Sequence, residues 1–241
     1  MLYIFIMKLG VNIDHIATLR NARGGVEPSI IEAAKIALKK DILALTMHLR
    51  EDRRHIKDND LYDVKKLGAK INLEMAATEE IQKIALDLIP YSVCLVPERR
   101  QEITTEGGLD VAGQKECLKE FIKPLQAKGI LVSMFIDPDE KQVRASSYIG
   151  ADYIEMHTGS FSNAFLMGEY KNEFEKLKEA AHLAQSLGLK VNAGHGLNYE
   201  NVYLMKQIPG LCELNIGHSI ISKAVFVGLG SAISQMLDLI K

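Results

Sequence analysis

The sequence predicts an α/β protein of the (β/α)₈ (TIM) barrel class, with extra short helices. Short apolar runs typical of strands alternate eight times with helix-like runs within 241 residues. The first of these runs leads into G-V-N-I-D-H-I, which is not the glycine-rich turn that an open dinucleotide-binding sheet requires at that point. No linker rich in proline or serine divides the chain. We therefore predict one domain over residues 1–241, in which residues 1–6 are an upstream extension because Met7 offers a second start.

The strands are expected where apolar and β-branched residues follow a turn signal. Gly68, Gly129, Gly150 and Gly188 each stand just before such a run, and glycine commonly ends the preceding helix. The predicted strands cover residues 8–13, 42–47, 70–75, 91–96, 129–136, 152–157, 189–194 and 211–216.

The helices are expected between these strands, where apolar residues recur with a helical period. Thr78 is expected to cap one of them, since two acidic residues follow it. The loop over residues 97–113 is long and carries paired glycines, which favours a hinged lid. The predicted helices cover residues 28–40, 59–68, 78–88, 114–129, 139–150, 169–188, 198–208 and 229–241, with a short helical run at 219–226.

Composition excludes several classes of partner. Lysine and arginine number 29 against 31 acidic residues, for a net charge of −2, so no basic excess directs the chain to nucleic acid or to an anionic membrane. No apolar run approaches the roughly 18 residues of a membrane span, and the N-terminus lacks the features of a signal peptide. Three cysteines form no C-x-x-C pair and are expected to be buried, inert thiols. A cytoplasmic location is expected.

Chemistry-bearing side chains gather at the predicted carboxyl ends of the strands, where (β/α)₈ barrels place their active sites. Six of the seven histidines lie at or just after such an end, and we expect the seventh, His182, to be structural. This clustering predicts an acid–base active site. The polar residues at the strand ends are Asn12, Asp14, His15, His48, Arg50, His55, Asn72, Glu74, Glu98, Asp137, Glu155, His157, Asn192, His195, Asn215 and His218.

Some of these residues have a structural alternative. His48 and Glu74, on neighbouring strands, could form a structural ion pair, but a carboxylate beside an imidazole also supports proton transfer, and we favour that role. Asp14 and His15 could equally cap the segment that follows them.

Two acidic residues are interpreted as structural. Asp137 precedes Pro138 and is expected to cap a helix. Glu98 stands beside Arg99 and Arg100, and we interpret it as part of a solvated charge run.

Two glycine motifs predict phosphate binding. N-A-G-H-G at 192–196 follows strand seven, and N-I-G-H-S at 215–219 follows strand eight and opens a short helix. Barrels often hold phosphate there, on backbone N–H groups such as those of Gly196, Gly217 and His218.

A second anion site is suggested by H-L-R-E-D-R-R-H at 48–55. Arg50 and His55 are expected to point inward, whereas Arg53 and Arg54 are expected to be exposed.

A metal is not expected, since neither H-x-H on one strand nor H-E-x-x-H is present. No lysine stands at a strand end after residue 70, which disfavours a Schiff-base mechanism. A metal-dependent hydrolase and a non-catalytic barrel that binds phosphometabolites remain the alternatives.

Long, ordered motifs resemble one family. They include G-V-N-I-D-H-I-A-T-L-R-N-A-R-G-G, H-L-R-E-D-R-R-H-I, N-L-E-M, L-V-P-E-R-R-Q-E-I-T-T-E-G-G-L-D-V, I-E-M-H-T-G, G-L-K-V-N-A-G-H-G-L and E-L-N-I-G-H-S-I-I. Together they resemble the pyridoxine 5′-phosphate synthases of vitamin B6 biosynthesis. The resemblance implies a cofactor-free, metal-free homo-octamer that condenses 3-amino-2-oxopropyl phosphate with 1-deoxy-D-xylulose 5-phosphate, giving pyridoxine 5′-phosphate, inorganic phosphate and water.

The resemblance also implies roles for individual residues. It assigns acid–base catalysis to His48, Glu74 and His195, and stabilisation of developing charge to Glu155. The aminoketone phosphate would be held by Asn12, Arg23, Gly196, Gly217 and His218. The sugar phosphate would be held by Asp14, His15, Arg50, His55 and Thr104.

Overall fold

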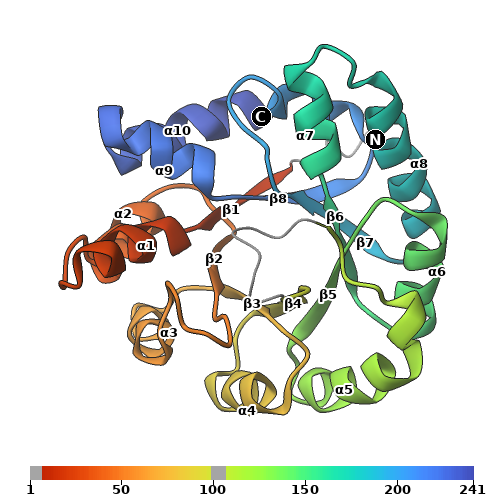
Figure 1. Ribbon diagram of the computed structural model, residues 1–241, viewed down its shortest axis with the longest axis horizontal. Helices are drawn as coiled ribbons and strands as arrows, with labels where there is room; N and C mark the ends of the chain where they lie inside the picture. Colours follow the sequence, from red (N-terminus) through yellow and green to blue (C-terminus); the bar gives the residue numbers. More distant parts are fainter. Residues whose placement is uncertain (1–6, 99–106) are drawn as a thin grey trace, which may run out of the picture.

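The computed structural model describes residues 7–98 and 107–241, and its centre is a closed barrel of eight parallel strands (Figure 1). Each strand pairs with the next along the chain, and the last pairs with the first. All eight predicted strands are confirmed, with ends that agree within two residues. They are β1 (Lys8–Asn12), β2 (Ala44–His48), β3 (Ile71–Met75), β4 (Ser92–Leu95), β5 (Leu131–Ile136), β6 (Tyr153–His157), β7 (Lys190–Gly194) and β8 (Leu211–Ile216).

Helices surround the barrel, and the last two pack beside the first two, where the chain closes on itself (Figure 1). Among the described residues, no helix combines the length and the apolar character needed to cross a membrane. The α-helices are α1 (Asp14–Arg23), α2 (Ile30–Leu38), α3 (Asp58–Lys65), α4 (Glu79–Leu88), α5 (Lys115–Ala127), α6 (Glu140–Tyr148), α7 (Gly159–Leu166), α8 (Lys171–Ser186), α9 (His218–Val227) and α10 (Leu229–Ile240). Two 3₁₀ turns are η1 (Ala112–Gln114) and η2 (Val202–Gln207).

Left-handed glycines set the point at which the chain leaves a helix for the next strand. Gly68, Gly129, Gly150 and Gly188 have φ angles of +75°, +75°, +81° and +84°. A Cβ at any of the four would meet nothing within 4 Å. The backbone angle, rather than lack of space, therefore favours glycine there.

The strands alternate between an apolar outer face and a polar inner face. Outward residues such as Leu45 and Leu73 are fully buried under the helices. Inside the barrel, the Thr46 hydroxyl donates to Asn215 Oδ1 at 2.8 Å, and other polar residues line the same space. The apolar core thus lies between strands and helices, while the inner wall carries hydrogen-bonding groups up to the mouth.

Helix α1 was not predicted, because its buried face is polar. Its buried residues are Asp14, Ala17 and Arg20, and the Arg20 guanidinium pairs with Asp60 at 2.7 Å. An apolar period was therefore absent. Helix α7, which opens G-S-F-S, was missed as well.

Other local predictions need correction. The helix expected over 198–208 is the 3₁₀ turn η2. Thr78 occupies the N-cap of α4, but its hydroxyl makes no capping hydrogen bond. The three cysteines are free, yet Cys117 is exposed while Cys94 is buried.

Candidate active site

His48 and Glu74 lie at the mouth of the barrel on neighbouring strands. They are register partners at the ends of β2 and β3, and His48 Nδ1 lies 3.9 Å from Glu74 Oε2. The imidazole is 8% exposed and the carboxylate 17% exposed. The prediction that these two residues lie side by side is confirmed.

Glu98 belongs to this cluster, and its interpretation as a solvated charge is wrong. His48 Nε2 donates to Glu98 Oε1 at 2.8 Å, and only 4% of the Glu98 side chain is exposed. The other carboxylate oxygen accepts the backbone N–H of Glu51 at 3.0 Å. Burial alone would raise the pKa of Glu98, but the hydrogen bonds to His48 and Glu51 and the nearby charges of His48 and Arg50 together outweigh it. The pKa of Glu98 is therefore lowered.

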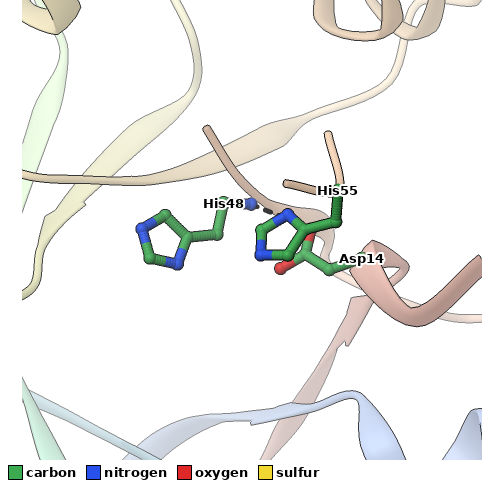
Figure 2. Close-up of side chains that lie close together, drawn as sticks. All are labelled: Asp14, His48 and His55. Atoms are coloured by element: carbon green, nitrogen blue, oxygen red, sulfur yellow. Dashed lines mark hydrogen bonds between the residues drawn. The ribbon is translucent and has the colours of Figure 1, made fainter. Parts of the chain in front are cut away.

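Asp14 connects the first strand to the second. Its Oδ1 accepts the backbone N–H of His48 at 3.0 Å, as Figure 2 shows, and its Oδ2 accepts from Asn12 Nδ2 at 2.8 Å. Burial raises the pKa of Asp14 to about 6. Asp14 is the first residue of α1 rather than its cap, which is Ile13. Its carboxylate therefore serves the mouth of the barrel, and the capping alternative is wrong.

His55 completes a compact group with Asp14 and His48 (Figure 2). Each residue offers one atom with metal-ligand chemistry, and these atoms lie within 4.8 Å of one another. Burial lowers the pKa of His55 to about 3, so its imidazole is neutral at physiological pH. The three residues could hold a divalent cation in terms of donor type. Both oxygens of Asp14 already accept hydrogen bonds, however.

Glu155 stands inside the barrel on β6. It is 2% exposed, and its Oε2 accepts from Asn215 Nδ2 at 2.6 Å. The Cys94 thiol lies 3.8 Å from the same oxygen. Burial raises the pKa of Glu155 to about 7, and burial together with the charges of Asp14 and Glu155 raises the pKa of Glu74 well above its usual value. Both carboxyls can therefore carry a proton near neutral pH.

His195 follows β7 in a left-handed backbone conformation with φ +78°. Its ring centroid lies 5.0 Å from that of His157 and 6.5 Å from that of Phe135. Burial, with smaller contributions from His157 and His15, lowers the pKa of His195 to about 4. This imidazole is thus a neutral group at pH 7.

A second histidine–carboxylate pair stands beside His195. His157 Nδ1 donates to Asp137 Oδ1 at 3.0 Å, and that hydrogen bond is the largest cause of the lowered pKa of Asp137. The capping role expected for Asp137 is wrong, because Asp139 caps α6 with bonds to Lys141 and Gln142.

Three of the five residues predicted for the aminoketone phosphate, Asn12, Gly217 and His218, come together. Gly217 is the N-cap of α9 and His218 is its first residue, and the first N–H groups of a helix are the ones that commonly face an anion. A Cβ on Gly217 would lie 2.9 Å from Asn12 Cβ, and the His218 ring lies 5.1 Å from the His15 ring. Gly196 packs instead against Ser162, and a Cβ added to Gly196 would lie 2.8 Å from Ser162 Cβ.

The three arginines of the segment 48–55 differ in how far they are exposed to solvent. Arg50 is buried and its Nε lies 3.3 Å from Asp52 Oδ1. Arg53 is half-buried rather than exposed and pairs with Asp58 and Glu80, whereas Arg54 is exposed as expected.

One predicted binding residue does not join the cluster in this chain. Arg23 is exposed at the far end of α1. It lies about 13 Å along the helix from Asp14 at the usual rise per residue. Residues 99–106 of the expected lid, Thr104 among them, fall outside the described residues.

The fold and the mouth together define a class: a closed (β/α)₈ barrel whose strand ends bring histidines and carboxyl groups together at one mouth. The family of the chain follows from sequence. The model of the family described as pyridoxal phosphate biosynthesis protein PdxJ matches residues 9–241, and the chain belongs to this family.

Curated relatives agree over nearly the whole length. The chain is 55% identical to pyridoxine 5′-phosphate synthase of Sulfurihydrogenibium sp., with 97% of this chain and 98% of the relative covered. It is 55% identical to the enzyme of the same name from Geobacter sulfurreducens, with 97% and 98% covered. For that of Neisseria meningitidis, the identity is 54% with 96% of each chain covered.

Solved structures with low sequence identity share the barrel. KGPDC from Streptococcus mutans superposes with a TM-score of 0.64 at 11% identity, over 98% of this chain and 97% of that one. Phosphoribosyl anthranilate isomerase from Thermus thermophilus gives a TM-score of 0.56 at 12% identity, over 95% and 100%. At such identities the likeness concerns the fold alone.

Proposed function

We propose that this chain is a pyridoxine 5′-phosphate synthase, which condenses 3-amino-2-oxopropyl phosphate with 1-deoxy-D-xylulose 5-phosphate to give pyridoxine 5′-phosphate, inorganic phosphate and water. The observation that carries the proposal is the match of residues 9–241 to the family. The convergence of His48, Glu74 and Glu155 at one barrel mouth supports it independently.

The reaction requires repeated proton transfers. An amine adds to a ketone and water leaves, a carbon next to a carbonyl or imine is deprotonated, phosphate departs, and a carbon–carbon bond closes the ring. Each well-placed acid or base contributes roughly 10²–10⁴-fold. His48, Glu74 and His195 act as these acids and bases, and Glu155 stabilises charge that develops beside it.

The raised carboxyl pKa values suit these roles. The pKa of Glu74 is raised well above its usual value by burial and by the charges of Asp14 and Glu155, so this carboxyl can carry a proton near physiological pH and pass it on. His195, whose pKa is lowered to about 4, approaches a substrate as a neutral imidazole. It can therefore accept a proton from carbon or donate a hydrogen bond without adding a cation to the site.

The two phosphates are assigned to different parts of the mouth. The aminoketone phosphate is held by Asn12, Gly196, Gly217 and His218. The family resemblance alone assigns Arg23 to the same phosphate, since in this chain Arg23 is exposed at the far end of α1. The sugar phosphate is held by Asp14, His15, Arg50, His55 and Thr104. The start of helix α9 and the buried guanidinium of Arg50 support the two anion sites.

The assembly and location are proposed on the family resemblance. The chain forms a homo-octamer in the cytoplasm and requires no metal or organic cofactor.

The decisive experiment mixes purified protein with the two phosphates. We expect the absorbance of a pyridine ring to appear together with free phosphate in equal amount. Binding of both compounds without turnover would favour the non-catalytic barrel. Phosphate release without ring formation would favour the hydrolase.

A further inference from the structure

Glu98 contacts His48, but the sequence motifs and the proposed chemistry give Glu98 no role. Glu98 follows the end of β4, whereas His48 ends β2. Because β3 lies between these strands, the Glu98 side chain reaches across the strand that carries Glu74. Its contact with the imidazole is a hydrogen bond of 2.8 Å between two side chains that are 8% and 4% exposed.

The geometry points to Glu98 as a positioning residue, which holds the proton on Nε2 of His48 and so presents the Nδ1 lone pair to Glu74 and the substrate. This inference rests on the proposed function, in which His48 is one of the acid–base groups.

The tautomer follows from the contacts. A carboxylate accepts hydrogen bonds and cannot donate them when ionised, and the pKa of Glu98 is lowered. Nε2 of His48 must therefore carry the hydrogen. In the neutral imidazole the other nitrogen, Nδ1, is then the acceptor. Nδ1 lies 3.9 Å from Glu74 Oε2.

This arrangement supplies a balanced proton step. A proton leaves the carboxyl of Glu74, or a carbon of the substrate, and forms an N–H bond at Nδ1 of His48. The imidazolium that results has an ionised carboxylate at Nε2, so its positive charge is stabilised without a change in position. The reverse step returns the proton through the same nitrogen.

Glu98 is itself held in place. Its second oxygen accepts the backbone N–H of Glu51, which fixes the carboxylate between the loops that follow β2 and β4. A purely structural interpretation would assign Glu98 only to this connection between loops. The two interpretations predict different kinetics.

The test is a double-mutant cycle of Glu98→Gln and His48→Ala. Glutamine keeps the size and an oxygen for the Glu51 N–H, but it removes the charge and allows the amide to turn its NH₂ toward Nε2. In the wild-type background we expect Glu98→Gln to lower kcat about 10- to 100-fold, the range for a residue that orients a functional group, with KM for both phosphates little changed. In the His48→Ala background, the rate is followed with excess enzyme by the appearance of pyridine absorbance. We expect less than about a twofold further loss of this rate, because the partner of Glu98 is gone.

Glu120→Gln is the matched control. It removes a carboxylate that is exposed on α5 and paired with Lys123, and we expect wild-type kcat. Melting temperature is measured for every variant.

The outcomes are distinct. The inference is overturned if Glu98→Gln lowers kcat by the same factor in both backgrounds, if it changes KM alone, or if it lowers the melting temperature by many degrees with kcat preserved. If the wild-type protein forms no pyridine product, the proposed function itself fails, and that result is separate from the cycle.

Discussion

The two imidazoles assigned to proton transfer, His48 and His195, are held in place by different means. His48 is fixed by hydrogen bonds, since Glu98 bonds its ring and Asp14 bonds its backbone. His195 is fixed by packing and by its backbone. It has φ +78°, its carbonyl accepts the Thr158 hydroxyl at 2.6 Å, and no ring hydrogen bond to it is found in the described part of the chain.

Their electrostatic surroundings differ as well. Carboxylates surround His48, with Glu98 at one ring nitrogen and Glu74 near the other. Histidines and Phe135 surround His195. The second environment keeps the His195 imidazole neutral, because burial lowers its pKa. We call the surroundings of His48 the carboxylate side of the mouth and those of His195 the packed side, and changes on the two sides should have different consequences.

The largest expected effect is on the carboxylate side. Glu74→Gln keeps the shape of the side chain and removes the base, so we expect turnover to fall by about two to four orders of magnitude. Melting temperature and affinity for the phosphate ligands should change little, because Glu74 carries a raised pKa rather than a strong structural ion pair. Steady-state kinetics and thermal melts measure both. A variant that melts several degrees earlier and keeps most of its activity would establish the structural ion pair instead.

On the packed side, the expected effect is on stability. A Cβ on Gly196, which has φ +82°, would lie 2.8 Å from Ser162 Cβ. Gly196→Ala therefore combines an unfavourable left-handed backbone, about 1–2 kcal/mol, with overpacking of about 1–3 kcal/mol. Gly24→Ala is the matched control, since Gly24 has φ +65° but nothing lies within 4 Å of its Cβ position.

We expect Gly196→Ala to lower the melting temperature clearly more than Gly24→Ala does. Equal losses in the two variants would show that Ser162 moves aside without cost. In that case, packing would not be what holds this side of the mouth.

Sequence alone was sufficient for the barrel and for most of the mouth. The eight strands were predictable because apolar runs and left-handed glycines recur along the βα units. His48 and Glu74 could be placed together because the carboxyl ends of neighbouring parallel strands meet at one edge. Helix α1 was not predictable from an apolar period, since the face that it buries contains Asp14 and Arg20.

The missed site residues were obscured by their neighbours in sequence. Glu98 precedes two arginines, a pattern that is typical of a charged surface loop. It nevertheless stands three residues after the end of β4, and the carboxyl ends of the strands are where barrels place their active-site residues. Asp137 precedes a proline and reads as a cap, although its partner His157 lies at the end of the adjacent strand β6. A search for an acidic residue and a histidine at the carboxyl ends of two neighbouring strands would have identified Asp137.

The two sides should also respond to pH in opposite directions. Glu155 has a folded-state pKa of about 7, above the usual 4.5, so the folded protein binds more protons than the unfolded chain between these values. Glu155 therefore contributes to the free energy of unfolding at pH 4.5, and this contribution is lost as the pH rises through 7. His195 has a folded-state pKa of about 4, below the usual 6.5. His195 therefore contributes to the free energy of unfolding above pH 6.5, and this contribution is lost as the pH falls toward 4.

Melting curves of two variants between about pH 4 and 8, a range that spans both transitions, test this contrast. Relative to the wild type, Glu155→Gln should gain stability as pH rises, and His195→Gln should gain stability as pH falls. Parallel shifts at all pH values would show that neither group titrates differently in the folded and unfolded states.

The smallest expected effect concerns metal. Asp14, His48 and His55 are the group on the carboxylate side with metal-ligand chemistry. The Asp14 oxygens are occupied by donors from His48 and Asn12, and His48 Nε2 is occupied by Glu98. A cation would have to break these bonds, which also position His48. We therefore expect exhaustive chelation to leave turnover unchanged, and added zinc to inhibit rather than activate, with inhibition weakened in His55→Gln. Loss of activity on chelation that only a divalent ion restores would instead place a metal at the centre of the carboxylate side and favour the hydrolase alternative.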